Sequence, residues 1–256
     1  MLTSTARSVP RKPSATERSQ LPLAPPEFWQ DIHPAGTFDP VPADGFRDLY
    51  PSALPDGRQV ALPIRILPGG KQAVASLIVN QASFVVEDSL AEAMADLARP
   101  FDADIIIGIP TLGLPLANGV ARRLGHRRMV PLGTSRKFWY RDELSEPLSS
   151  ITSPDHAKRV FLDPRLLPLL ENRRVIVVDD VISSGASMTA VLRLLGRIGI
   201  KPVAAVFAMT QGERWRDALA DLDRTLPTLV FSAIASPIFA VTPEGLWRPE
   251  LSVQDI

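Results

Sequence analysis

The chain has 256 residues, of which 45% are hydrophobic and 22% are charged, enough for one sizeable core with a small appended unit. Its formal net charge is zero and no apolar run approaches the length of a membrane span, so we expect neither nucleic acid nor membrane as a partner. The chain has no cysteine, which excludes disulfides, thiolate catalysis and cysteine–zinc sites.

The N-terminal stretch, residues 1–26, is rich in Ser, Thr and Pro and lacks the apolar core of a secretory signal. We expect this stretch to be a disordered tail and the protein to be cytoplasmic. The 25 prolines of the chain concentrate in this tail and in residues 34–68. Residues 27–68 are therefore predicted to be rich in loops.

The next segment predicts a change from strand to helix. The apolar pattern of residues 76–86 predicts a hairpin or two short strands, broken near Asn80. Asp88 and Ser89 then predict the cap of a helix that runs to Arg99. The apolar residues of that helix would share one buried face.

A strand, a turn and a helix follow as a first βαβ unit. Residues 104–109 predict a buried strand, residues 111–113 a turn and residues 114–124 a helix. A short strand over residues 128–132 completes the unit. The turn precedes a helix N-terminus, where free backbone N–H groups favour an anion.

Between residues 133 and 173 the only regular pattern is a short helical possibility over residues 164–171. A stretch of about forty residues without clear elements is uncommon in a compact domain and usually forms a functional loop. Near its start it carries a basic pair and three adjacent aromatic residues, Arg136, Lys137, Phe138, Trp139 and Tyr140.

A second βαβ unit follows, with a strand over residues 175–178, a helix over residues 188–195 and a strand over residues 203–209. Residues 213–222 predict a further helix, and residues 228–234 predict a last strand. This alternation of strands and helices predicts an α/β fold with a doubly wound, mostly parallel sheet.

The strongest candidate site follows the strand at residues 175–178. Asp179 and Asp180 lie where this buried strand should emerge, at the edge of the sheet where ligands bind. Adjacent carboxylates repel each other and need a cation or hydrogen-bond donors. Small and hydroxyl residues around a glycine then open a helix: Ser183, Ser184, Gly185, Ala186 and Ser187. Such a loop offers hydroxyls and free N–H groups to a phosphate.

Simpler interpretations of these residues exist. Taken singly, each serine after a strand is an ordinary helix cap. A glycine-containing turn such as Thr111, Leu112 and Gly113 is common between a strand and a helix. Paired aspartates after a strand also occur in phosphorylation-receiver domains, but there the pair lies near the domain start and no serine–glycine loop follows it.

Residues 176–187 resemble the phosphoribosyl-pyrophosphate (PRPP) signature of the type I phosphoribosyltransferases. That signature is four hydrophobic residues, two acidic residues, two hydrophobic residues, and then small and hydroxyl residues around a glycine. The resemblance covers about residues 100–210 and implies a doubly wound sheet with a small hood domain and a long lid loop. We therefore expect a hood over residues 27–86, a core over 87–235 that includes a lid segment, residues 133–173, and a tail over 236–256 that could join the hood.

The resemblance also implies a role for each candidate residue. Asp179 and Asp180 would hold the ribose hydroxyls of PRPP and, directly or through water, a magnesium ion (Mg2+). Residues 183–187 would cradle the 5′-phosphate, and residues 111–113 would contact the pyrophosphate leaving group. Mg2+ is the expected cofactor.

The lid segment carries several candidates with open interpretations. Arg136 and Lys137 fall where the family's lid has cations that meet the pyrophosphate, although a solvated basic pair is the simpler interpretation. The three aromatics after them could pack the lid segment down, stack on a base or form a subunit interface. The hydroxyl-rich residues 149–154 could be a turn or a phosphate contact. Beyond the lid segment, Trp215 could stack on a base, with packing on an amphipathic helix as the simpler interpretation.

The resemblance implies transfer of a 5-phosphoribosyl group from PRPP to a nucleobase, with release of pyrophosphate. A purine is favoured on family frequency, and orotate or uracil stays open, because no residue pattern in the expected hood names a base. A homodimer is expected. The alternative is a non-catalytic regulatory protein that senses PRPP; such proteins usually attach a DNA-binding module, for which this chain shows no pattern.

Overall fold

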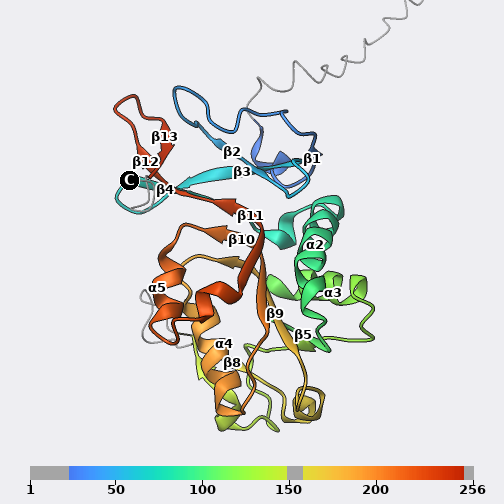
Figure 1. Ribbon diagram of the computed structural model, residues 1–256. Helices are drawn as coiled ribbons and strands as arrows, with labels where there is room; N and C mark the ends of the chain where they lie inside the picture. The colour runs from blue at the N-terminus through green and yellow to red at the C-terminus, as the bar shows by residue number, and fades with distance from the viewer. Residues whose placement is uncertain (1–22, 149–157, 251–256) are drawn as a thin grey trace, which may run out of the picture.

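The computed structural model describes residues 23–148 and 158–250. Its centre is a five-stranded parallel sheet with helices on both faces (Figure 1). In spatial order the strands are β11 (Val230–Ser236), β10 (Ala204–Gln211), β9 (Val175–Ile182), β5 (Ile105–Gly108) and β6 (Val130–Pro131). The predicted doubly wound α/β sheet is therefore confirmed.

Each face of this sheet carries its own hydrophobic cluster. The helices are α2 (Phe84–Ala98) and α3 (Gly113–Arg123) on one face, and α4 (Ala186–Arg197) and α5 (Arg214–Ala220) on the other. The side chains from Val175 to Val178 alternate between the two clusters, and all are 0% exposed. β9 therefore has no room for a charge before Asp179. No helix in the described ranges is both long and apolar enough to cross a membrane.

Strand β9 and helix α4 are longer than predicted. β9 runs to Ile182 rather than Val178, because its residues stay in parallel register with β10 beyond the acidic pair. α4 begins at Ala186, so the predicted phosphate loop consists of a three-residue turn and the first turn of this helix. Short 3-10 helices in the described ranges are η1 (Pro25–Glu27), η2 (Val79–Gln81), η3 (Arg99–Phe101), η4 (Asp142–Leu144), η5 (Pro164–Leu169) and η6 (Leu226–Leu229).

A second, antiparallel sheet joins the N-terminal and C-terminal parts of the chain (Figure 1). Its strands are β1 (Ile32–His33), β2 (Leu49–Ala53), β3 (Gln59–Ile66), β4 (Gln72–Ala75), β12 (Ile238–Val241) and β13 (Trp247–Pro249). β12 pairs with β4, so the segment after residue 237 belongs to the same sheet as the N-terminal region. The region predicted to be rich in loops, 27–68, thus contains three strands between its loops.

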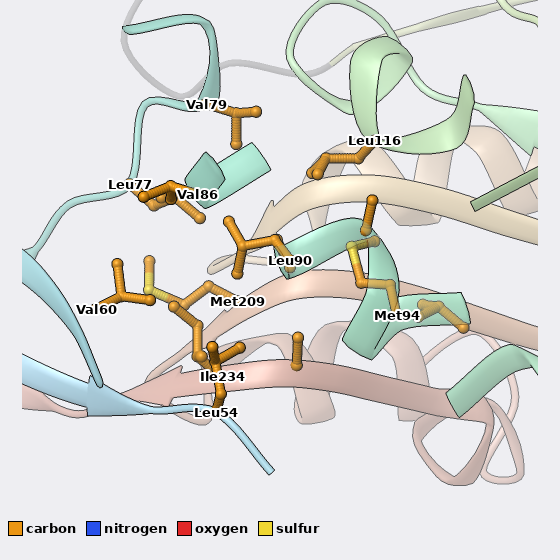
Figure 2. Close-up of a cluster of buried hydrophobic side chains, with 14 of the residues drawn as sticks. Leu54, Val60, Leu77, Val79, Val86, Leu90, Met94, Leu116, Met209 and Ile234 are labelled. Atoms are coloured by element: carbon orange, nitrogen blue, oxygen red, sulfur yellow. The ribbon is translucent and has the colours of Figure 1, made fainter. Parts of the chain in front are cut away.

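The second sheet packs on the core through a buried hydrophobic cluster (Figure 2). The cluster includes Leu54, which follows β2, together with Met209 of β10 and Ile234 of β11. The side-chain amide of Gln211 also donates a hydrogen bond to the carbonyl oxygen of Ala75 (2.7 Å). The second sheet therefore lies against the carboxyl ends of β10 and β11.

The start of α2 differs from its prediction. The strands predicted over residues 76–86 are wrong, because this segment forms η2 and the first turn of α2. α2 begins at Phe84 since the Oγ of Ser83 caps it, accepting a hydrogen bond from the N–H of Val86 (3.3 Å). The predicted cap at Ser89 therefore lies inside the helix. The aromatic and β-branched residues at its start favour a strand, but the cap and the burial of Val86 outweigh that propensity.

The lid segment, residues 133–173, is more regular than predicted. β7 (Ser145–Pro147) and β8 (Arg159–Phe161) form an antiparallel pair within it. Val160 and Leu162 are 0% exposed and belong to the cluster on the α4 face of the core sheet. The prediction of a segment without strands is wrong because strands of three residues are too short to show an alternating pattern.

Candidate active site

The acidic pair lies near the carboxyl end of β9, the middle strand of the core sheet. Asp179 is 6% exposed, and its Oδ1 accepts a hydrogen bond from the backbone N–H of Asp180 (2.9 Å). Burial and the neighbouring Asp180 carboxylate raise the pKa of Asp179, and burial raises the pKa of Asp180. Keeping both carboxyls ionised therefore costs free energy. A cation or several hydroxyl donors would offset that cost, so the acidic pair is suited to bind either or both.

The turn after β9 is built around Gly185. Its φ is 79°, and a Cβ at this position would lie 3.1 Å from the Cβ of Ala218 and 3.2 Å from the Cα of Trp215. Glycine therefore lets the chain pass close to α5 and turn directly into α4. The first-turn N–H groups of α4 have no partner inside the helix and carry positive partial charge. Together with the serine hydroxyls they favour an anion.

This turn encloses a cavity of about 170 Å³, with Asp179, Ser183, Ser184, Ser187 and Phe207 among its lining residues. Pockets for whole drug-sized ligands measure roughly 300–1,000 Å³, so this cavity suits one end of a ligand. The structure thus brings Asp179 onto the loop that is predicted to hold a phosphate. Phe207 is absent from the sequence prediction. It lies opposite Asp179 in β10, and pairing the two predicted strands in parallel register could have found it.

The turn before α3 touches the acidic pair. A Cβ on Gly113 would lie 2.5 Å from Oδ1 of Asp179 and 2.7 Å from its Cα, so the site has no room for a larger residue. The peptide bond between Pro110 and Thr111 in this turn is cis. The turn predicted to contact pyrophosphate and the carboxylates predicted to hold ribose are therefore direct neighbours.

The structure does not bring the basic pair of the lid segment to these residues. Arg136 and Lys137 are exposed, and Nη1 of Arg136 lies 2.6 Å from Oδ1 of Asp142 within the lid segment itself. Within residues 23–148 and 158–250, no hydrogen bond or ion pair links Arg136 or Lys137 to the acidic pair. Their contact with pyrophosphate stays a prediction.

Two further candidates can be placed. Trp215 is 2% exposed, and its Nε1 donates a hydrogen bond to the carbonyl oxygen of Gly212 (3.0 Å), so its interpretation as a packing residue is confirmed. The hydroxyl-rich residues 149–154 lie outside the described residues.

The model of the phosphoribosyl transferase domain family matches residues 80–236, more than half of the chain. The matched range contains the acidic pair, the loop around Gly185 and the turn around Gly113. The chain belongs to this family.

Curated relatives share parts of this chain. Amidophosphoribosyltransferase 3, chloroplastic, from Arabidopsis thaliana is 32% identical over 130 residues, which cover 50% of this chain and 23% of that protein. The hypoxanthine/guanine phosphoribosyltransferase of Methanosarcina mazei is 30% identical over 112 residues, which cover 44% of this chain and 54% of that protein. The chain thus spans between about a quarter and about half the length of these relatives.

A solved structure shares the fold. The APRTase from Giardia lamblia, solved in complex with 9-deazaadenine, superposes with a TM-score of 0.54 at 17% identity. The superposition covers 68% of this chain and 93% of that one. At this identity the likeness is one of fold alone.

Proposed function

We propose that the protein transfers a 5-phosphoribosyl group from PRPP to a nucleobase, with a purine as the first candidate, and releases pyrophosphate. The adjacency of three groups carries the proposal: Asp179 lines the cavity of the loop around Gly185 and lies against Gly113. PRPP has three matching groups: ribose hydroxyls for Asp179, a 5′-phosphate for the loop around Gly185, and a pyrophosphate for the turn around Gly113. The hypoxanthine/guanine relative supports a purine as acceptor.

The residues at the end of β9 would bind and orient the donor. The first-turn N–H groups of α4 and the hydroxyls of Ser183 and Ser187 would bind the 5′-phosphate. Asp179 and Asp180 would accept hydrogen bonds from the ribose hydroxyls. The N–H groups at the start of α3, beside Gly113, would face the pyrophosphate. The donor would then be fixed at both ends before reaction, which lowers the entropic part of the barrier.

The reaction exchanges one bond at the anomeric carbon of ribose. The bond to the pyrophosphate oxygen breaks and its electron pair leaves with the pyrophosphate, while a nitrogen of the base forms the new bond and passes its proton to water or to the departing pyrophosphate. Positive charge grows on the ribose ring in a transition state resembling an oxocarbenium ion, and ionised Asp179 and Asp180 favour that charge. Arg136 and Lys137 would neutralise the departing pyrophosphate.

Magnesium fits this site as an ion shared with the substrate. Within the described residues, no group of three or more His, Cys, Asp or Glu side chains could hold a metal ion by itself. Mg2+ usually combines one or two carboxylates with substrate phosphate oxygens and water. Asp179 and Asp180 supply two carboxylates whose pKa values are raised, a cost that a cation would offset. They would hold the ion directly or through water, and the ion would neutralise pyrophosphate charge when bound.

The second sheet would supply the acceptor side of the site, as the expected hood. Its strand β12 follows β11 after a single residue, and the Oγ of Ser52 in β2 donates a hydrogen bond to the carbonyl oxygen of Ala235 in β11 (2.6 Å). These links hold the second sheet at the carboxyl edge of the core sheet, on the side of the donor loop, which is the loop around Gly185 that would bind PRPP. A base bound between the two sheets would meet the anomeric carbon there.

The test is pyrophosphate release from PRPP and Mg2+ with a panel of acceptors: adenine, hypoxanthine, guanine, orotate, uracil and ammonia. Ammonia is included because curated relatives are amidophosphoribosyltransferases. We expect release with at least one purine. Asp180→Asn should slow it by about 10²–10³-fold, since a charge aimed at the transition state is removed, with the circular dichroism spectrum unchanged.

Other outcomes would redirect the proposal. Release with ammonia, orotate or uracil alone would replace the purine as acceptor. Tight PRPP binding without release for any acceptor would contradict the enzyme and support the PRPP-sensing alternative. Normal turnover by Asp180→Asn would remove the acidic pair from the mechanism.

A further inference from the structure

The three adjacent aromatics of the lid segment have different environments. Phe138 is 96% exposed, whereas Trp139 is 39% exposed. The ring of Tyr140 packs on the ring of Phe161, with centroids 5.8 Å apart. Two of the three rings therefore hold the start of the lid segment to its buried second half, whereas the exposed ring of Phe138 meets the ring of Trp139 edge to face, with centroids 4.8 Å apart.

Trp139 is fixed by a charged pair. Its Nε1 donates a hydrogen bond to Oδ2 of Asp163 (3.2 Å), and the guanidinium carbon of Arg165 lies 4.9 Å from the centre of its ring. Nη2 of Arg165 donates to the same Asp163 oxygen (2.6 Å). We call Trp139, Asp163 and Arg165 the clasp. An indole between a carboxylate acceptor and a cation makes a hydrogen bond and a cation–π contact together.

The clasp is attached to a buried part of the lid segment. Asp163 is 8% exposed and caps η5, accepting the backbone N–H of Arg165 at Oδ1 (2.9 Å). The preceding residue, Leu162, is 0% exposed. Trp139 is thus held by a residue whose own position is set by burial and capping.

The basic pair lies on a short loop that is closed at both ends. At its start, Gly133 and Phe161 exchange two backbone hydrogen bonds (2.9 and 2.8 Å), and at its end Trp139 contacts Asp163. Lys137 is two residues from Trp139, a chain length of at most about 7 Å. The clasp therefore restricts where the backbone of Lys137 can lie.

The start of this loop lies beside the predicted pyrophosphate turn. The N–H of Leu132 donates to the carbonyl oxygen of Gly108 (3.0 Å), which is the last residue of β5 before that turn. Lys137 is five residues from Leu132, at most about 18 Å of chain. Among the residues that the structure describes, Arg136 is paired only with Asp142, in an exposed ion pair, and exposed pairs contribute little, so Arg136 can exchange this partner for an anion.

We propose that the clasp positions Arg136 and Lys137 for the departing pyrophosphate, with Trp139 and Asp163 as positioning residues. This inference rests on the proposed phosphoribosyl transfer. Phe138 packs edge-on against the ring of Trp139 but is 96% exposed, and its removal leaves the hydrogen bond and the cation–π contact of the clasp in place.

The test compares Trp139→Ala with Phe138→Ala, a matched loss of one aromatic ring from the same loop. Trp139→Ala should lower kcat for pyrophosphate release by about 10- to 100-fold, the range that misplacement by an ångström can produce. KM for the base should stay within twofold. Trp139→Phe, which keeps a ring for Arg165, should recover part of the loss, and Phe138→Ala should behave as the unaltered protein.

A double-mutant comparison separates positioning from general damage. In an Arg136→Ala/Lys137→Ala background, Trp139→Ala should lower kcat by less than twofold further, because both residues that the clasp positions are already gone. If the effect of Trp139→Ala multiplies with that of removing the basic pair, the proposal is overturned, since Trp139 would then act independently of Arg136 and Lys137.

A second readout does not depend on activity. Tryptic cleavage after Arg136 and Lys137, followed by mass spectrometry, should be at least tenfold faster in Trp139→Ala than in Phe138→Ala. Equal cleavage rates would overturn the clasp. If the unaltered protein releases no pyrophosphate with any acceptor, both the proposed function and the positioning role of the clasp are contradicted. Faster cleavage of Trp139→Ala would then still show that the clasp is a fixed contact.

Discussion

Asp163 and Asp179 are both buried aspartates, and their surroundings are opposite. Hydrogen bonds from the side chain and backbone of Arg165, with a further one from Trp139, hold the pKa of Asp163 well below its usual range. Burial and the neighbouring Asp180 raise the pKa of Asp179. A buried carboxylate whose oxygens accept several hydrogen bonds from the protein has a structural role. One with few hydrogen-bond donors around it is suited to accept hydrogen bonds from a ligand.

The largest expected difference between the two residues is in activity. Asp179→Asn should reduce pyrophosphate release by about 10²–10³-fold, because the ribose loses an ionised acceptor. The thermal midpoint should stay the same or rise, since the substitution removes an ill-compensated buried charge. Parallel measurements of initial rate and thermal unfolding check both parts. A lowered midpoint with normal activity would make Asp179 a structural residue like Asp163.

Gly113→Ala tests whether the acidic pair and the turn before α3 form one unit. The new Cβ would lie 2.5 Å from Oδ1 of Asp179, so either the turn or the carboxylate must move. We expect a loss of activity of at least tenfold and a destabilisation of about 1–3 kcal/mol, as for other overpacked sites.

Gly196→Ala is the matched control for this change. Gly196 lies in α4, and a Cβ there would meet nothing within 4 Å. The control should leave activity unchanged and raise stability by up to about 1 kcal/mol, since alanine is the better helix former. Full activity in Gly113→Ala would show that the turn is not part of the site.

Asp163→Ala should differ from Asp179→Asn in its effect on stability. Arg165, Trp139 and the first turn of η5 each lose a hydrogen-bond acceptor, so the free energy of unfolding should fall by about 1–3 kcal/mol. Urea denaturation measures this change. Asp163→Asn should cost less, because the amide oxygen can still cap η5. An unchanged urea midpoint in Asp163→Ala would contradict a structural role for this residue.

The smallest expected effect is a pH dependence. The pKa of Asp163 is lower in the folded chain than its ordinary 3.8, so the unfolded state binds more protons between these two values. The stability that Asp163 contributes is therefore present in full above its unfolded pKa and is lost as pH falls through the folded one. Urea midpoints of the unaltered protein and Asp163→Asn should begin to converge below about pH 4 and approach each other further as the pH falls. A difference that stays constant down to pH 3 would exclude this ionisation as the cause.

The donor loop could be predicted from sequence because its parts are consecutive. Buried β9, the acidic pair and the start of α4 follow one another within residues 175–187, so local patterns suffice. Contact of this loop with Gly113 could be anticipated only from the order of the strands. That position 113 has no room for a residue larger than glycine depends on its distance from Asp179, which a sequence pattern does not give.

The rest depends on contacts between distant residues. Trp139 and Asp163 are 24 positions apart, and neither has a local pattern that would mark it as part of a clasp. β4 pairs with β12, although most of the chain lies between them. The start of α2 was mispredicted because residues with strand propensity are held in a helix by a cap and by burial.

The most direct test is the binding of PRPP with Mg2+, measured by titration calorimetry on three proteins: the unaltered chain, Asp179→Asn and Asp163→Asn. The account predicts that Asp179→Asn weakens PRPP binding by about 10- to 100-fold, which corresponds to the free energy of a hydrogen bond to a charged group. Asp163→Asn should bind PRPP within about threefold of the unaltered protein, which is under 1 kcal/mol. Equal affinity of Asp179→Asn and the unaltered protein for PRPP would contradict the assignment of the acidic pair to the donor site.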